Sequence, residues 1–234
     1  PTRVREVLAP VFETIDRVKA KLPSATTLIG FAGAPWTVAT YMIAGRGTDD
    51  SAPARRFAEH HPQAFAALID LLTAATTDYL IAQVEAGAEV LQIFESWAET
   101  VPVQEIEPYS LAPIRRIIAG VREKTSVPVI VFPRGAGQNY ARYASETLAT
   151  AISIDTVTPM ASAIQAFPTE TVLQGNLDPE ALIAGGTRLA TAVGEIATAT
   201  RGRPHIFNLG HGVRPETPIE HVADLVRLIR NPAA

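Results

Sequence analysis

Six short apolar runs, separated by longer helical patterns, constrain the fold of this 234-residue chain more than any other feature. Each run is apolar along most of its length, which is typical of strands that are buried on both faces. We therefore predict six strands of a parallel sheet. They are expected at Thr27–Gly33, Val90–Ser96, Pro128–Arg134, Ala151–Val157, Thr171–Leu177 and Pro204–His211.

The segments between these runs have helical patterns. The predicted helices span Pro62–Gly87, Ser110–Glu123, Gln138–Thr150, Asp178–Thr200 and Pro218–Arg230. The first of them has apolar residues around much of its circumference, so we expect it to be well buried. Ser110 and Asp178 are predicted N-caps, and the helix after Asp178 is expected to break at Gly185-Gly186.

Strands that alternate with helices form right-handed βαβ units around a parallel sheet. No Gly-x-Gly-x-x-Gly and no Gly-x-x-x-x-Gly-Lys follows any predicted strand, which argues against a Rossmann or P-loop nucleotide site. An α/β fold of the (β/α)8 TIM-barrel type fits the pattern, and six of its βα units are visible. We expect residues 1–234 to form a single barrel domain with its chemistry at the carboxyl ends of the strands.

Composition excludes several classes of function. The formal net charge is −4 and no long basic run occurs, so nucleic acid is not expected as a partner. The chain has no cysteine, which excludes disulfides and thiolate metal sites and fits a cytoplasmic protein. No apolar run approaches the length of about 20 residues that a membrane-spanning helix needs, so no membrane partner is expected.

Polar residues at the predicted strand ends are the candidates for a functional site. His211 lies between two glycines, which would let the imidazole and the backbone approach a ligand, or it is a turn residue facing water. Tyr41, which follows a loop after the first strand, could donate to a carboxylate or be a core tyrosine. Ser96 could donate to a ligand or cap a helix. Arg134 could clamp an anion or be a surface cation.

The remaining polar residues favour structural roles or no role at all. Asp155 could cap a loop or face a ligand, and Asp178 is expected to be structural. His60 and His61 are expected to be solvated, and His205 begins a strand at the opposite end of a barrel. The histidines lack the spacing of a metal site, so we predict a cofactor-free barrel that holds a ligand rich in carboxylates.

The chain resembles the uroporphyrinogen decarboxylase family, which acts in haem and chlorophyll biosynthesis. Four separate segments in the family's order carry the resemblance over nearly the whole chain. They are Gly30–Thr37 with Tyr41-Met42, Leu91–Ala98, Gln174–Pro179 and Phe207–Gly212.

The resemblance implies a homodimeric (β/α)8 barrel that uses no metal or organic cofactor. It implies removal of the acetate carboxylates of uroporphyrinogen, which gives coproporphyrinogen. By the family pattern, Tyr41, Ser96 and His211 match positions that hydrogen-bond substrate carboxylates. Phe31 and Phe94 match apolar positions that line the cleft against the macrocycle. Protonation of a pyrrole carbon makes the ring an electron sink, and the protein holds the carboxylates and stabilises the cation.

The sequence departs from the family pattern at its start. The family's arginine-bearing first strand and the aspartate associated with its second strand have no counterpart in residues 1–24. We therefore expect the first two strands, and the catalytic Asp and Arg, to lie upstream of this chain.

Two other functions are weighed. Zinc-dependent corrinoid methyltransferases are related to this family, but they bind zinc through histidine and cysteine, and cysteine is absent here. A non-catalytic fragment that binds tetrapyrroles without decarboxylating them is the second alternative.

We expect the 234-residue chain alone to be inactive and poorly folded. A six-strand arc would expose two sheet edges and part of an apolar interior. Its ligand would lack arginine partners, whose charge-assisted hydrogen bonds contribute about 1.5–3 kcal/mol each. The rate of coproporphyrinogen formation by the purified chain tests the predicted inactivity. Turnover near that of a full-length homologue would contradict this prediction.

Overall fold

The computed structural model describes residues 3–45 and 51–230. The chain divides into two compact units, Pro1–Thr150 and Ala151–Ala234, which we describe separately. Each unit contains three of the six predicted strands, and every strand is shorter than its apolar run. The prediction of a single barrel domain over residues 1–234 stays a prediction.

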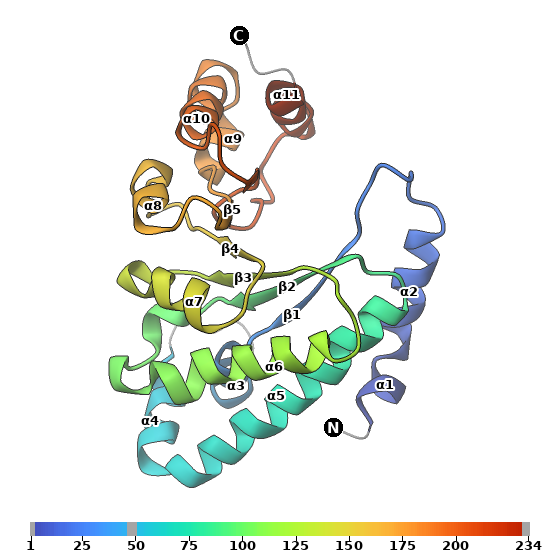
Figure 1. Cartoon of the computed structure of the whole chain (residues 1–234), viewed down its shortest axis with the longest axis vertical. Helices are drawn as coiled ribbons and strands as arrows, with labels where there is room; N and C mark the ends of the chain where they lie inside the picture. Colours follow the sequence, from blue (N-terminus) through green and yellow to red (C-terminus); the bar gives the residue numbers. More distant parts are fainter. Residues whose placement is uncertain (1–2, 46–50, 231–234) are drawn as a thin grey trace. The chain divides into compact units, whose positions relative to one another are not determined.

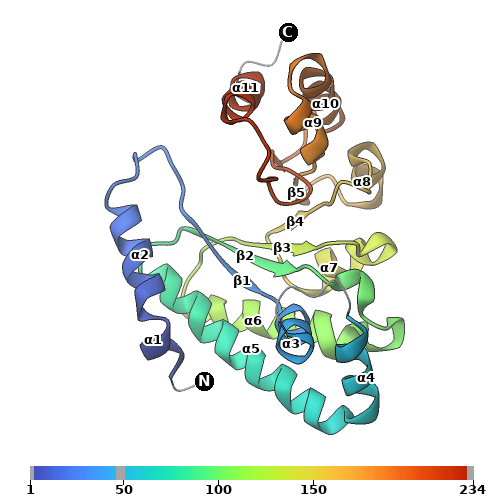
Figure 2. The same ribbon diagram turned by 180° about the vertical axis from the view of Figure 1, so that it is seen from behind.

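The first unit is a parallel three-stranded sheet covered by helices. The strands are β1 (Ile29–Gly33), β2 (Val90–Glu95) and β3 (Val129–Pro133), with Gly33 opposite Phe94 and Phe94 opposite Phe132. Figures 1 and 2 show α5 and α6 lying along one face of this sheet. The helical segments of this unit are α1 (Val4–Val7), α2 (Ala9–Lys19), α3 (Pro35–Ala44), α4 (Ala52–His60), α5 (Pro62–Glu85), η1 (Ala98–Thr100), η2 (Val103–Glu105), η3 (Glu107–Leu111), α6 (Ala112–Arg122), η4 (Gly137–Asn139) and α7 (Tyr140–Glu146).

Helix α3 corrects the prediction that Tyr41 follows a loop. Its sequence, PWTVATYMIA, is apolar on nearly all sides, so it lacks the 3.6-residue periodicity that would have indicated a helix. The remaining signal was Pro35 at the first helical position, where its fixed φ suits a helix start. Tyr41 therefore lies on a helix, within one turn of its end.

Helix α5 is long and apolar enough to cross a membrane by length and composition alone. The prediction that no apolar run approaches this length is therefore wrong. In the first unit the Gln83 amide of α5 bonds both the N–H and the C=O of Phe31 in β1. Leu71 on its other side is 49% exposed, so the prediction of a well-buried helix holds for one side only. A core helix passes the same length test, so this finding is weak evidence for a span.

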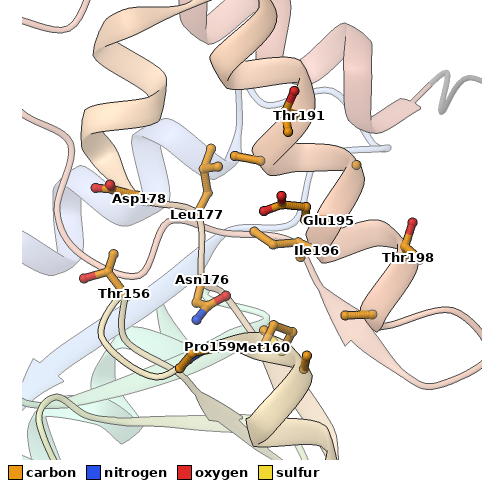
Figure 3. A pocket seen from close by; sticks show the side chains of 14 residues that line it. Thr156, Pro159, Met160, Asn176, Leu177, Asp178, Thr191, Glu195, Ile196 and Thr198 are labelled. Carbon is orange, nitrogen blue, oxygen red and sulfur yellow. The ribbon is translucent and has the colours of Figure 1, made fainter.

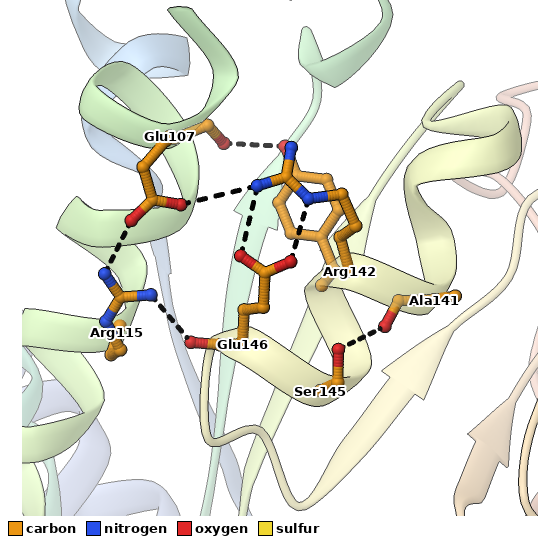
Figure 4. A network of polar contacts seen from close by, with 8 residues as sticks. Glu107, Arg115, Ala141, Arg142, Ser145 and Glu146 are labelled. Atoms are coloured by element: carbon orange, nitrogen blue, oxygen red, sulfur yellow. Dashed lines mark hydrogen bonds and ion pairs between the residues drawn. The ribbon is translucent and has the colours of Figure 1, made fainter.

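Ser110 is not a helix N-cap. It lies inside the π-helical segment η3, and α6 begins two residues later, after Leu111. Figure 4 shows the ion pairs that hold η3 to α6 and α7. Glu107 of η3 lies 2.6 Å from Arg115 Nη2 and 3.6 Å from Arg142 Nη2, and Arg142 also pairs with Glu146. These exposed pairs contribute little individually, but together they fix the segment that carries Ser110.

The second unit contains the other three strands. They are β4 (Ala151–Ser153), β5 (Val172–Gln174) and β6 (His205–Ile206), and all are parallel. The helices are α8 (Met160–Ala166), α9 (Pro179–Ala184), α10 (Gly186–Ala199) and α11 (Ile219–Arg230). Leu177, Leu182, Leu189, Val193 and Leu225 form its apolar core.

The predicted cap and break after β5 are confirmed. The Asp178 carboxylate accepts a hydrogen bond from Glu180 N at 2.9 Å, and Pro179 is the first residue of α9. Gly185 has φ +64°, and a Cβ there would lie 2.4 Å from the His221 ring. Glycine is needed at this position for both reasons, so the helix ends and α10 starts anew.

Replacing Asp178 by alanine should lower the free energy of unfolding by about 1 kcal/mol, because the α9 cap is lost. Asp178→Asn is the matched control, since asparagine caps helices about as well as aspartate. Chemical denaturation of the full-length protein measures both variants. An equal loss in both would show that the charge matters and the cap does not.

Candidate functional site

Aromatic side chains form a continuous row across one face of the first unit's sheet. The rings of Phe31 and Phe94 lie 5.8 Å apart edge to face, and those of Phe94 and Phe132 lie 6.0 Å apart. Phe31 is 59% exposed and Phe94 is half-buried. An apolar surface of this kind suits the flat face of a large ring system.

Tyr41 contacts the segment that directly follows β2. The Tyr41 ring, 42% exposed, meets the Trp97 ring edge-on at 6.3 Å. Ser96 is half-buried, and its carbonyl accepts a hydrogen bond from Arg134 Nε at 2.9 Å. The first unit therefore brings Tyr41 and Ser96, two of the predicted donors, to neighbouring segments.

Arg134 is neither an unpaired surface cation nor an open anion clamp. Besides the Ser96 carbonyl, its guanidinium contacts the Glu99 carboxylate at 3.1 Å. Both partners lie in the segment that follows β2, so Arg134 fastens the end of β3 to that segment. In this structure Arg134 therefore holds Ser96 in place through its backbone.

The carboxylate at the end of β2 is buried. The sequence places Glu95 among the strand-end candidates but indicates no role for it. Glu95 is fully buried, and it accepts hydrogen bonds from Thr37 N at 3.1 Å and Thr37 Oγ1 at 2.5 Å. Ser110 Oγ donates to its other oxygen at 2.9 Å, and the Tyr143 hydroxyl lies 2.7 Å from Ser110 Oγ. The only sequence signal was a charged residue inside an otherwise apolar run, which is rare unless the charge is satisfied.

Burial raises the pKa of Glu95 to about 7, and the hydrogen bonds from Thr37 and Ser110 oppose this rise. Burial also raises the pKa of Tyr143, with a further contribution from the Glu95 charge. An ionised Glu95 can only accept hydrogen bonds, so Ser110 Oγ donates its single hydrogen to the carboxylate. Ser110 Oγ must then accept a hydrogen bond from the Tyr143 hydroxyl, and the ionised carboxylate thereby sets the direction of both hydrogen bonds.

His211 lies in the second unit, after the bridge between Leu177 and Leu209. Its side chain is exposed, and Gly212 N donates to its Nδ1 at 2.8 Å. Nδ1 is therefore the acceptor, and in the neutral ring the proton is on Nε2, ready to be donated to a ligand.

The glycines beside His211 act differently from what the sequence suggested. A Cβ on Gly210 would lie 2.5 Å from Thr156 N, so its small size lets the chain approach its own backbone, not a ligand. A Cβ on Gly212 would meet nothing within 4 Å. Neither residue has a positive φ.

Other strand-end residues of the second unit have structural partners. Asp155 accepts from Thr158 N at 3.1 Å, and Asn176 Nδ2 donates to the carbonyls of Asp155 and Thr158. His205 begins β6, as predicted, and its Nε2 lies 2.7 Å from the Gly175 carbonyl, while burial lowers its pKa. His60 and His61 are exposed, as expected.

The second unit also contains a cavity of about 820 Å³ (Figure 3). Met160, Leu177 and Ile196 form apolar walls, and Asn176, Asp178 and Glu195 contribute polar atoms. His211 does not line it. Across residues 3–45 and 51–230, no group of three or more His, Asp or Glu side chains could hold a metal ion.

The chain is similar to known proteins over nearly its whole length. The sequence model of the family described as uroporphyrinogen decarboxylase (URO-D) matches residues 1–232. The uroporphyrinogen decarboxylase of Hyphomonas neptunium is 51% identical over 99% of this chain and 67% of its own length. That of a Chelativorans species is 48% identical over 98% and 67%. The chain thus spans about two thirds of the length of these relatives.

Solved structures support the fold. A methyltransferase from Methanosarcina mazei covers 100% of this chain and 68% of its own, with a TM-score of 0.85 at 19% identity. A B12-independent methionine synthase from a Shewanella species has a TM-score of 0.68 at 11% identity over 94% of this chain and 66% of its own. At these identities the likeness concerns the fold alone, and it bears out the predicted α/β fold of TIM-barrel type. By the family match and the sequence identity to its relatives, the chain belongs to the uroporphyrinogen decarboxylase family.

Proposed function

We propose that the protein containing this chain removes the acetate carboxylates of uroporphyrinogen and leaves methyl groups, which gives coproporphyrinogen. The observation that carries this proposal is the 51% identity to a uroporphyrinogen decarboxylase over 99% of the chain. The two alternatives, a zinc methyltransferase and a non-catalytic fragment, have no such support.

The reaction needs little beyond positioning and electrostatics. Protonation of a pyrrole carbon gives a cation that accepts the electron pair of the bond between the acetate methylene and its carboxylate. Carbon dioxide leaves, the exocyclic methylene takes up a proton, and the ring loses its added proton to become aromatic again. The protein's task is to hold the other carboxylates still and to stabilise the cation while it exists.

We assign five side chains of this chain to substrate binding. Phe31 and Phe94 would lie against the macrocycle, which the exposed ring of Phe31 and the half-buried ring of Phe94 beside it suit. Tyr41, Ser96 and His211 would donate hydrogen bonds to the carboxylates. In support, Tyr41 is partly exposed beside Trp97, and His211 has its Nδ1 engaged by Gly212 N, which leaves Nε2 to donate.

We further propose that the protein is a cytoplasmic homodimer without a metal or an organic cofactor. Sedimentation at micromolar concentration tests the dimer. Conversion of uroporphyrinogen by the chelator-treated, full-length protein, followed by chromatography of the oxidised porphyrins, tests the activity. Absence of coproporphyrin from a folded sample would overturn the proposed function.

Replacing Tyr41 by phenylalanine should raise KM for uroporphyrinogen about tenfold, because one hydrogen bond to a carboxylate is lost while the ring remains against Trp97. Tyr79→Phe is the control, since Tyr79 lies on α5 with its ring against Phe12. Steady-state kinetics measure both variants. Equal KM values for wild type and Tyr41→Phe would remove Tyr41 from the site.

Replacing His211 by asparagine should weaken substrate binding between pH 6 and 8, because the imidazole whose Nε2–H would donate to a substrate carboxylate is lost. His60→Asn at the end of α4 is the matched control, because His60 is also exposed. Binding of uroporphyrinogen under anaerobic conditions gives the affinities. An affinity equal to that of wild type between pH 6 and 8 contradicts the role given to His211.

A further inference from the structure

The buried Glu95 links the two segments that carry Tyr41 and Ser96. Glu95 is the last residue of β2, and Ser96 follows it directly. The Glu95 carboxylate accepts hydrogen bonds from the backbone N–H and the hydroxyl of Thr37, in the first turn of α3. Tyr41 lies four residues later on the same helix. Residues four apart lie on the same face of a helix, so the Thr37 contact fixes the face that presents Tyr41.

Helix α3 has no cap of its own at its first turn. Its N-cap residue is Ala34, whose methyl group cannot accept a hydrogen bond, so α3 has no side-chain cap. The free N–H groups of a first turn favour a negative charge. The Glu95 carboxylate supplies that acceptor from the neighbouring strand, so the start of α3 is tied to β2 and not to its own preceding loop.

The remaining contacts of Glu95 are equally specific. Ser110 donates to the second oxygen, and Tyr143 completes the chain from α7. Four elements, β2, α3, η3 and α7, therefore meet at one carboxylate with all of these side chains buried. An apolar residue at this position would avoid the desolvation cost, so a carboxylate with this set of partners favours a role in fixing geometry.

We infer that Glu95 is a positioning residue, which holds α3 against the end of β2 so that Tyr41 and Ser96 meet the same substrate. The inference rests on the substrate-binding roles given to Tyr41 and Ser96 in the proposed function. It assigns to Glu95 no contact with substrate. The geometric part, that Glu95 fixes these two side chains relative to each other, stands apart from the reaction.

Glu95→Gln is the most informative substitution because it preserves volume. The new amide N–H₂ is a donor. If it faces Ser110, the hydrogen bonds from Tyr143 to Ser110 and from Ser110 to residue 95 must reverse their direction; if it faces Thr37, it meets two donors and is repelled. We expect kcat/KM for uroporphyrinogen to fall about tenfold to a hundredfold, the range that displacement of positioning groups by an ångström produces. Thr37→Val, which removes only the hydroxyl donor, should give a smaller loss of the same kind.

A second genetic background separates positioning from a merely structural effect. In a Tyr41→Phe, Ser96→Ala enzyme, the groups that Glu95 positions are already gone, so Glu95→Gln should lower kcat/KM less than about twofold further. A loss by the same factor in both backgrounds would overturn the inference. Thr73→Val is the matched control for Thr37→Val, since Thr73 is buried on α5 and its hydroxyl donates to the Ile69 carbonyl of its own helix.

Crystal structures of the substrate-free, full-length wild type and of Glu95→Gln give a readout that does not depend on activity. We expect the first turn of α3 to move away from β2 and Tyr41 to shift relative to Ser96 by more than about 0.5 Å, the tolerance of a preorganised site. Unchanged positions would refute the inference even in an active enzyme. If Glu95→Gln fails to fold, Thr37→Val carries both tests. If wild type shows no decarboxylation, the proposed function fails, while the crystallographic comparison still decides the geometric inference.

The pH dependence of stability gives a separate check on the state of the carboxylate. Tyr143, on α7, is the titratable group joined to Glu95 through Ser110, and it stays neutral below pH 10 because its pKa is raised. With the pKa of Glu95 raised to about 7 in the folded protein, wild type should lose stability relative to Glu95→Gln as the pH rises from about 4.5 to about 7. A flat difference over this range would show that Glu95 is not held in the buried environment described.

Discussion

The arrangement of the first unit depends on one carboxylate that has been taken out of water. Glu95 ends β2 inside the layer between sheet and helices, and it has the partners that a buried carboxylate needs. Removal of any one donor would leave part of a charge unsatisfied, which costs more than a typical hydrogen bond contributes. The positions of α3, η3 and the end of β2 are therefore coupled, because they share the same acceptor.

This coupling places the functional candidates of the first unit next to one another. Phe94 and Glu95 are neighbours on a strand, so their side chains point to opposite faces. Phe94 joins the aromatic row on one face, and Glu95 reaches the helices on the other. Ser96 then leaves the strand with its carbonyl held by Arg134. Three consecutive residues thus belong to three different sets of contacts: Phe94 to the aromatic row, Glu95 to the buried hydrogen bonds, and Ser96 to the segment that Arg134 holds.

The second unit is organised by close approach of backbone segments. Gly210 allows the turn before His211 to pass directly over the backbone of Thr156, and Asn176 bonds two carbonyls of the loop after β4. Asp155 completes this set by accepting from Thr158 N. The result is a rigid turn that presents His211 at the surface, with its Nδ1 occupied by the next backbone N–H.

Sequence patterns predict the six strands, the alternation with helices, the cap at Asp178 and the break at Gly185-Gly186, because these depend on local apolar runs and on the backbone preferences of single residues. The sequence misses helices that lack such a pattern. It also indicated the family, since four ordered segments match at once. It missed α3, whose uniform apolarity hides the helical period, and it misread Ser110 as a cap. The roles of Glu95 and Arg134 depend on contacts between distant segments of the chain. Their partners, Thr37, Ser110 and Glu99, come from other elements, and no local pattern shows which donor will reach a buried carboxylate.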